Sequence, residues 1–216
     1  MKAAHEIRII GGRFKRSKLP VADRPGLRPT PDRVRETLFN WLGQDLNGWR
    51  CIDAFAGAGA LGFEAASRGA TSVWMIERDG ALATSLRAVK DRLDAQSVRV
   101  QAGDGLAALQ QAQAGSWDLI FLDPPYGSGL LEPAIAASVQ ALAPGGLLYV
   151  ESDARLDSRL WDPNHCAPHA QPPWELFRHM KAGQVHAHLL GAATLTGSIA
   201  PNPSSAPPFR DEEMTP

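Results

Sequence analysis

The amino-acid sequence predicts an α/β fold of the Rossmann-like class, built on a seven-stranded, mostly parallel sheet. Three observations support this prediction. Between Arg50 and Glu151, short apolar runs alternate with segments of helical periodicity, and strands joined by helical crossovers form parallel sheets that are covered on both faces. A glycine-rich loop separates the first predicted strand of this region from the first predicted helix. Near the C-terminus, two strand-like segments surround a Lys-Ala-Gly-Gln turn, which predicts an antiparallel hairpin.

The N-terminal residues predict a small basic β-hairpin followed by a connector and a helix. Residues 7–19 alternate loosely around a Gly-Gly turn and carry a basic edge. Four prolines in residues 20–31 are typical of an extended connector. We expect a helix to begin there, with Thr30 as its N-cap and Pro31 at its first helical position. We therefore assign residues 1–30 to an N-terminal hairpin and connector.

The elements of the main domain follow in regular order. Apolar runs predict strands at residues 51–55, 73–77, 98–102, 117–122, 147–151, 174–180 and 185–190. Helical periodicity predicts helices at residues 61–68, 79–93, 105–112 and 130–142. The domain is expected to span residues 31–196. Residues 197–216 contain five prolines and few large apolar side chains, so we expect them to form a disordered tail.

Composition limits the class of protein and points to a partner. The 216 residues include no run of 18 apolar residues, which predicts no membrane span. The N-terminus is not followed by an apolar stretch of the kind that would indicate a signal peptide. The two cysteines suit a reducing cytoplasm. The net charge is only −1, but it is unevenly distributed. Residues 1–50 hold 11 Lys/Arg against 5 Asp/Glu, and residues 51–216 hold 11 against 18.

This charge asymmetry predicts a surface that faces the phosphates of a nucleic acid. The candidate phosphate-binding residues all lie in the basic N-terminal third of the chain. They are Arg8, Arg13, Lys15, Arg16, Lys18, Arg28, Arg33 and Arg35.

The glycine-rich loop and two later acidic residues predict a site for an adenosine-containing cofactor. Gly57, Gly59 and Gly62 form a G-x-G-x-x-G pattern, and Glu77 follows 20 residues after the first glycine. Glu77 could bind two ribose hydroxyls, and Asp104, after the third strand of this region, could accept from an adenine amino group. Asp53, Phe55 and Asp123 complete the cofactor candidates. These residues alone do not distinguish NAD from S-adenosylmethionine.

The tetrapeptide Asp-Pro-Pro-Tyr after the fourth predicted strand of this region indicates the chemistry. The Asp123 carboxylate and the Pro124 carbonyl can both accept hydrogen bonds from an amino group. The prolines fix the backbone, and the Tyr126 ring offers a face on which a base can stack. We therefore expect Asp123, Pro124 and Tyr126 to be the catalytic residues of a methyl transfer from S-adenosylmethionine to an amino nitrogen. A dehydrogenase would need a His or Tyr-Lys acid, and none is placed for it.

With these motifs, the chain resembles the bacterial 16S ribosomal RNA guanine-N2 methyltransferases of the RsmD type. The closest segments are Ile7–Gly12, Gly26–Leu42, Phe55–Ala70, Asp123–Tyr126 and Lys181–Val185. The resemblance implies a class I methyltransferase domain over residues 31–196 that uses S-adenosylmethionine. It also implies a guanine in 16S ribosomal RNA as the target, within a partly assembled small subunit, and we expect a cytoplasmic monomer. The chain departs from the family pattern at His186 and His188, where a more aromatic strand is expected.

Three other functions are weighed against this interpretation. An adenine-N6 methyltransferase acting on DNA shares the Asp-Pro-Pro-Tyr motif, but the chain leaves little room for a separate target-recognition region. A nicotinamide-dependent oxidoreductase would make Asp123 structural. A non-catalytic RNA-binding module would have no use for the intact glycine loop. The pattern formed by His165, Cys166 and His169 lacks a partner cluster, so we predict no metal site.

Overall fold

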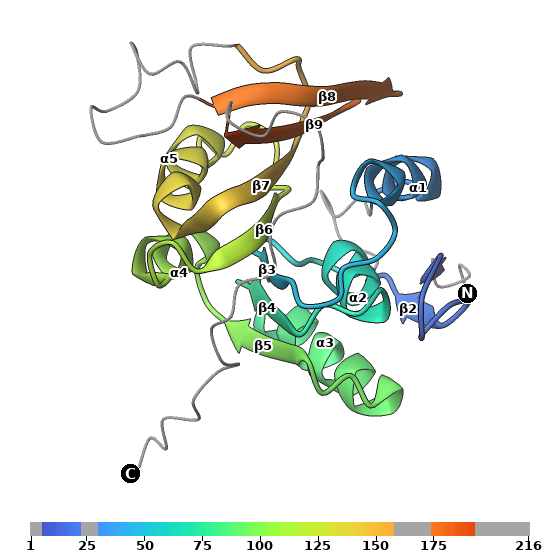
Figure 1. Ribbon diagram of the computed structural model, residues 1–216. Helices are drawn as coiled ribbons and strands as arrows, with labels where there is room; N and C mark the ends of the chain where they lie inside the picture. The colour runs from blue at the N-terminus through green and yellow to red at the C-terminus, as the bar shows by residue number, and fades with distance from the viewer. Residues whose placement is uncertain (1–5, 23–29, 158–173, 193–216) are drawn as a thin grey trace, which may run out of the picture.

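The chain is built around a seven-stranded sheet (Figure 1). The computed structural model describes residues 6–22, 30–157 and 174–192. The strands are β3 (Arg50–Asp53), β4 (Ser72–Glu77), β5 (Val98–Ala102), β6 (Trp117–Leu122), β7 (Leu142–Ser152), β8 (Trp174–Ala182) and β9 (Val185–Ala192). Their order in the sheet is β5-β4-β3-β6-β7-β9-β8. The first five of these run parallel to one another, and β9 is antiparallel to both β7 and β8. The predicted sheet and C-terminal hairpin are confirmed.

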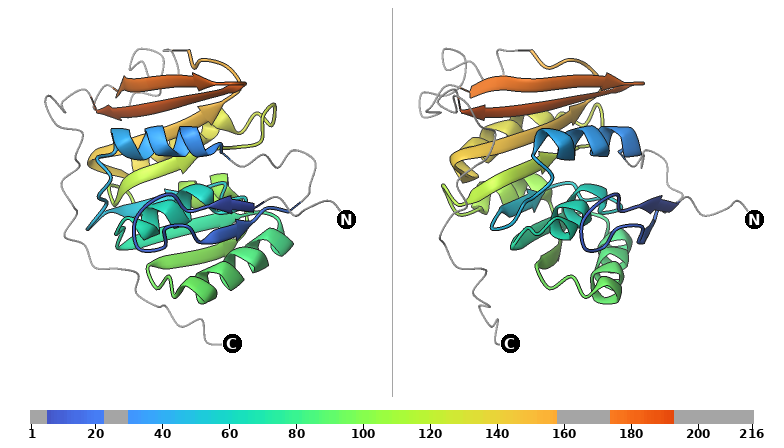
Figure 2. Two further views of the ribbon diagram at one scale, coloured as in Figure 1. Left: turned by 90° about the vertical axis from the view of Figure 1, so that its right-hand side faces the viewer. Right: turned by 45° about the vertical axis from the view of Figure 1, so that its right-hand side comes forward.

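Helices cover both faces of the sheet (Figures 1 and 2). On one face lie α1 (Asp32–Trp41), α2 (Ala60–Ser67) and α3 (Gly80–Leu93), and on the other lie α4 (Gly105–Gln111) and α5 (Leu131–Ala141). Each face has its own cluster of buried apolar side chains. Because the central strands are buried on both sides, they read as continuous apolar runs in the sequence.

The strand order changes direction between β3 and β6, and this change positions the site. The chain leaves β3 toward α2 on one face and leaves β6 toward α5 on the other. Such a switch point opens a crevice outside the carboxyl ends of the strands, where ligands of open α/β sheets bind. Asp53, the last residue of β3, pairs with Phe121 of β6 and Met75 of β4. The residues that follow these strands therefore meet at one edge of the sheet.

The N-terminal hairpin is present, but its turn is not tight. Strands β1 (Glu6–Arg8) and β2 (Lys18–Pro20) pair antiparallel, and the loop between them lies against α2. The peptide N–H groups of Ile10 and Gly11 donate to the Glu64 carboxylate at 2.8 Å, and that of Phe14 donates to Ser67 Oγ at 2.8 Å. The loop closes with backbone hydrogen bonds between Ile9 and residues 16 and 17, and it also bonds to a distant helix, a partner that local sequence does not reveal.

Two boundaries differ from the prediction. Pro31, not Thr30, is the N-cap of α1, and no side chain caps this helix. Thr30 is buried, and its side chain bonds instead with Glu151 at the end of β7. Strand β7 begins at Leu142, directly after α5, and continues through the Pro144–Gly146 segment that was expected to precede it. Among the residues that the structure describes, no helix is long and apolar enough to cross a membrane.

Candidate functional site

The glycine loop joins β3 to α2 at the switch point. Gly59 is the N-cap of α2 with φ +81°, and a Cβ there would lie 2.7 Å from side-chain atoms of Phe63 and Leu86. A Cβ on Gly62 would lie 2.8 Å from Met75 Cγ and 3.0 Å from Asp53 Oδ2. The glycines therefore allow a tight turn and close packing of α2 on the strands, which brings the N-terminus of the helix to the crevice.

Glu77 fastens this loop to the end of β4. Its Oε2 accepts the Gly57 N–H at 2.8 Å, and its Oε1 accepts the Asp79 N–H at 2.7 Å. Both oxygens are thus oriented by backbone donors, and each keeps a lone pair for a further donor such as a ribose hydroxyl. The structure brings Glu77 beside the loop, as the 20-residue spacing predicts.

Asp53 is a buried carboxyl group at the end of β3. It is 2% exposed, and its Oδ2 accepts the Gly62 N–H at 2.9 Å. Burial raises its pKa to about 7, with further contributions from the charges of Glu77 and Glu151. No described cation forms an ion pair with Asp53. A positively charged ligand would therefore stabilise its ionised form.

Asp104 and Phe55 lie at the same edge of the sheet. Asp104 is the N-cap of α4, where its Oδ1 accepts the Ala107 N–H at 2.9 Å. The sequence analysis did not predict this capping role, which fixes the exposed carboxylate in place. Phe55 is half-buried and packs against the apolar cluster under α4 and α5.

The Asp-Pro-Pro-Tyr segment follows β6 directly. Pro124 is buried, Asp123 is half-buried, and Tyr126 is 45% exposed, unusually open for a large aromatic side chain. The pKa of Asp123 is raised well above its usual range, first by burial and then by the charges of Glu151 and Asp53. A carboxyl group without a described cationic partner, Asp123, and an accessible ring, Tyr126, thus lie three residues apart at the crevice.

Sequence reasoning missed Glu151, a second carboxyl group beside Asp123. In the sheet, Leu122 of β6 pairs with Val150 of β7, so the residues that follow each of them are neighbours on one face. Glu151 is 2% exposed, and Tyr149 Oη donates to its Oε1 at 2.8 Å. Its pKa is raised by burial, against the lowering effect of these hydrogen bonds and of the Arg35 charge. The sequence did contain a signal for Glu151, because it is an acid at the end of an apolar strand, as Glu77 is.

The donor set of the crevice suits a cationic, adenosine-containing group. Asp53 and Asp123 form no ion pair with any residue that the structure describes, and both have raised pKa values. A sulfonium and an ammonium group are positive, and they would offset the mutual repulsion of these carboxylates. Glu77 and Asp104 supply acceptors for hydroxyl and amino groups. The residues therefore fit the cofactor predicted from the sequence.

Most of the predicted phosphate-binding residues are exposed. Arg8, Arg13, Lys15, Arg16, Lys18 and Arg33 are exposed, whereas Arg28 lies outside the described residues. Two of the exposed cations are already paired with acids, Arg13 with Asp94 at 3.6 Å and Lys18 with Glu6 at 2.7 Å.

A hollow of about 470 Å³ lies between the N-terminal hairpin and the end of α3. Its lining includes Arg8, Arg16, Lys18 and also Arg92, which the sequence analysis did not select. Arg92 donates to the main-chain oxygen of Lys18, which holds it at the hairpin. Four cations around one hollow suit a phosphate group.

The prediction for Arg35 is wrong. Its side chain is fully buried and forms ion pairs with Glu64 at 3.4 Å and with Asp32. It also donates to the main-chain oxygens of Arg8 and Thr30. Arg35 therefore fixes the hairpin and α1 to α2 and cannot reach a phosphate in this structure.

The pattern formed by His165, Cys166 and His169 lies outside the described residues, and so does the predicted tail at 197–216. Cys51, in contrast, is described and fully buried in β3 as a core residue.

Comparisons with known proteins point to one family. A family model described as conserved hypothetical protein 95 matches residues 7–190. The chain is 43% identical to ribosomal RNA small subunit methyltransferase D of Escherichia coli strain K12 over 183 residues, 83% of this chain and 87% of that protein. It is 38% identical to the protein of the same name from Haemophilus influenzae over 192 residues, 87% and 94% of the two chains.

Solved structures agree with this result. A structure described as putative methyltransferase yhhF from Escherichia coli has a TM-score of 0.72 at 38% identity and covers 87% of this chain and 98% of that one. A putative methylase from Haemophilus influenzae has a TM-score of 0.69 at 34% identity, covering 87% and 99%. A putative RNA methyltransferase from Pyrococcus horikoshii, 18% identical over 81% of this chain and 93% of that one with a TM-score of 0.62, is similar in fold.

Proposed function

The chain belongs to the RsmD family of ribosomal RNA small subunit methyltransferases, and we propose that it methylates the exocyclic N2 of a guanine in 16S ribosomal RNA. It is an S-adenosylmethionine-dependent methyltransferase. The observation that carries the proposal is the position of Asp123 and Pro124. They follow β6 at the switch point, at the same edge of the sheet as the glycine loop.

Each candidate cofactor-binding residue would contact a different chemical group of the cofactor. Glu77 would hold the ribose hydroxyls and Asp104 the adenine amino group, while Asp53 would face the positive end of the cofactor. When bound, the cofactor supplies a methyl group made electrophilic by its sulfonium sulfur. The positive charge would also lower the pKa values of Asp53 and Asp123 toward their usual range, because it stabilises the ionised forms. Both carboxyl groups would then be charged in the loaded site.

Asp123 and Pro124 would orient the amino group of the target base. The lone pair of a guanine amino nitrogen is drawn into the ring, so it must be turned out of the plane to attack. Hydrogen bonds from the two N–H groups to the Asp123 carboxylate and the Pro124 carbonyl would hold it in that orientation. The same carboxylate stabilises the positive charge that develops on nitrogen. Tyr126 would stack on a base that has been unstacked from its neighbours.

The substrate is proposed to be a partly assembled small subunit rather than free RNA, with the protein acting in the cytoplasm as a monomer. The exposed cations of the N-terminal hairpin and Arg92 would bind its phosphates. Phosphate contacts set orientation, and the pocket after β6 would select the base. An adenine-N6 activity on DNA uses the same motif, but the relatives named for their substrate act on ribosomal RNA. An oxidoreductase and a non-catalytic module do not fit the family.

The test is methyl transfer from labelled S-adenosylmethionine onto small subunits from cells that lack this protein, followed by nucleoside analysis. We expect label in N2-methylguanosine. Label in N6-methyladenosine would overturn the assignment of the target base. Free 16S RNA is assayed in parallel, and we expect it to be methylated more slowly than the small subunit.

The role of Asp123 is tested in the same assay. Asp123→Ala should lower the rate at least about a thousandfold, because it removes both an orienting acceptor and a transition-state charge. Binding of S-adenosylmethionine should remain measurable. Asp153→Asn, which changes an exposed acid just after β7, is the matched control and should leave the rate unchanged. A folded Asp123→Ala protein with the normal rate would remove this residue from the mechanism.

A further inference from the structure

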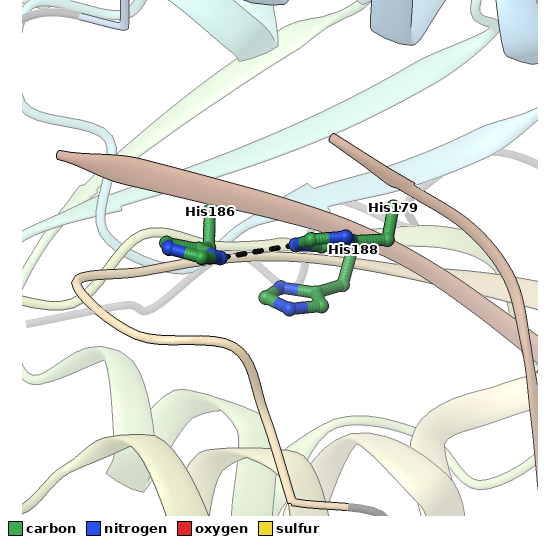
Figure 3. Close-up of side chains that lie close together, drawn as sticks. All are labelled: His179, His186 and His188. Atoms are coloured by element: carbon green, nitrogen blue, oxygen red, sulfur yellow. Dashed lines mark hydrogen bonds between the residues drawn. The ribbon is translucent and has the colours of Figure 1, made fainter. Parts of the chain in front are cut away.

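Three histidines from two adjacent strands lie together on the C-terminal hairpin (Figure 3). His179 belongs to β8, and His186 and His188 belong to β9. His179 pairs directly with His188 across the strands, and His186 is two residues from His188 on the same strand. Side chains at such positions point to the same face of a sheet.

The spacing of the ring nitrogens suits a shared ligand. His179 Nε2 and His186 Nδ1 are 3.0 Å apart, and one ligand nitrogen from each of the three rings lies within 4.8 Å of the others. A tetrahedral metal ion with bonds of about 2.0–2.1 Å places its ligand atoms about 3.4 Å apart. The first pair needs to move by only a few tenths of an ångström, whereas His188 must approach the other two.

His188 is oriented in the manner of many metal ligands. Its ring is fully buried, with Nδ1 3.4 Å from the Val150 main-chain oxygen and Nε2 accepting the Leu156 N–H at 3.2 Å. A proton on Nδ1 facing the carbonyl leaves the Nε2 lone pair as the donor to a metal. Leu156 would give up this bond, so binding requires a small shift of the segment that follows β7.

The neutral charge state of the histidine rings favours binding of a metal ion, whereas the nearby positive charge of Arg155 opposes it. Burial lowers the pKa of His188 to about 4, and the pKa of His179 is also lowered, chiefly by burial. Both rings are therefore neutral at pH 7 and keep a lone pair. The charge of Arg155 contributes to both shifts, so this arginine is close enough to repel a cation.

We propose that His179, His186 and His188 bind one divalent transition metal ion, such as Zn²⁺, with a water molecule as the fourth ligand. Imidazole nitrogens are preferred ligands of Zn²⁺, Cu²⁺ and Ni²⁺. On binding, the ring that donates across the His179–His186 hydrogen bond moves its proton to its other nitrogen by exchange with solvent, so that both rings stay neutral and each presents a lone pair to the metal. The ion would fasten β8 and β9 together at the edge of the sheet. The three residues take no part in the methyl transfer proposed above.

The test is titration of the full chain, free of any histidine tag, with Zn²⁺ by calorimetry and with Co²⁺ by visible absorption. We expect one equivalent to bind, with the absorption of a tetrahedral Co²⁺ complex. The His179→Gln/His186→Gln double variant changes two half-buried side chains and should weaken binding at least about a hundredfold. His165→Asn/His169→Asn, combined with Cys166→Ser, is the matched control and should bind normally.

Two outcomes would overturn the proposal: an unaltered chain that binds no metal, or binding that survives the first variant and disappears in the control. If the double variant does not fold, His186→Asn alone serves as the test. A further variant sharpens it, because Arg155→Gln removes the neighbouring positive charge. It should tighten Zn²⁺ binding several-fold at low salt, and unchanged or weaker binding would contradict the geometry.

Discussion

Two groups of buried charged residues lie on the same face of the sheet, and they differ in charge balance. In the first, Glu64 on α2 is fully buried between Arg35 and Arg68, at 3.4 and 2.7 Å. In the second, Asp53 and Asp123 share their surroundings with a third carboxyl group, and neither pairs with a described cation.

The three carboxyl groups of the second group have raised pKa values, which means that the folded protein resists their ionisation. Charges that satisfy one another inside the chain hold its parts together, as Glu64 does for the hairpin, α1 and α2. Carboxyl groups left without a cationic partner are positioned for a positive ligand, and here they lie at the switch point, where we propose that the cofactor binds. The two groups meet at Arg35, whose charge acts on both Glu64 and Glu151.

The largest expected effect comes from removing the charge in the paired group. Glu64→Gln should lower the free energy of unfolding by about 5 kcal/mol, the upper end for a broken buried ion pair, because two buried arginines lose their buried carboxylate partner. Urea denaturation at pH 7 measures this. Glu132→Gln, an exposed acid in the first turn of α5, is the control and should change stability by less than about 0.5 kcal/mol. Equal effects of the two substitutions would contradict the comparison.

Removing a charge from the unpaired group should raise the free energy of unfolding instead of lowering it. The pKa of Asp53 rises from its ordinary value of 3.8 to about 7 on folding. Ionisation therefore opposes folding fully above pH 7, and this cost disappears as the pH falls toward 4. Asp53→Asn should stabilise the cofactor-free protein by up to roughly 4 kcal/mol at pH 8 and by almost nothing at pH 4. Denaturation at both pH values measures this.

The same substitution should weaken binding of S-adenosylmethionine, since the cation loses a partner. A variant that is destabilised at pH 8, or that binds the cofactor more tightly, would show that Asp53 belongs to the structural group.

A smaller effect is expected from the ring that borders the unpaired group. Tyr126 is 45% exposed, so Tyr126→Ala should cost little stability but should raise the KM for the RNA substrate by about tenfold, the value of one base–aromatic stack. Tyr126→Phe keeps the ring and should behave almost as the unaltered protein. Steady-state methylation of small subunits measures both. An Ala variant with an unchanged KM would separate the ring from the base.

The smallest effect per residue is expected at the exposed cations, which belong to neither buried group. Arg16→Gln/Arg92→Gln changes two cations of the hollow beside α3. It should weaken RNA binding several-fold and reduce the salt slope of log affinity by about 1 to 2, since each lost phosphate contact contributes 0.7 to 0.9. Arg178→Gln, an exposed residue of β8, is the matched control. A slope that falls equally in both variants would exclude a localised phosphate site.

Much of the fold could be predicted because its signals are local. Apolar runs separated by helical periodicity located all seven strands of the sheet, and the glycine pattern located the loop between β3 and α2. The start of β7 was predicted too late, since Pro144 and the two glycines after it are local turn signals. The strand nevertheless begins at Leu142, which pairs with Trp117, and the register between β6 and β7 is irregular before it resumes at Leu147. The turn of the N-terminal hairpin was misjudged for a similar reason, because its backbone bonds with α2.

For the site, local sequence identified residue types and tertiary packing decided their roles. The Asp-Pro-Pro-Tyr segment and Glu77 could be found because each directly follows a strand, and parallel strands end at one edge. Arg33 and Arg35 are two residues apart in one basic segment, yet one is exposed and the other is buried against Glu64. Glu151 was passed over because its neighbour Asp123 is 28 positions away in the chain and adjacent only through the register of β6 and β7.

The sequence by itself therefore determined the order of strands and helices, the glycine loop between β3 and α2, and the Asp-Pro-Pro-Tyr segment that follows β6. Periodicity and turn residues act over a few positions and can be read without coordinates. The tertiary structure alone decided which charges are balanced, because whether an arginine meets phosphate or carboxylate depends on the helix packed against it. That choice is made by contacts between segments distant in the chain.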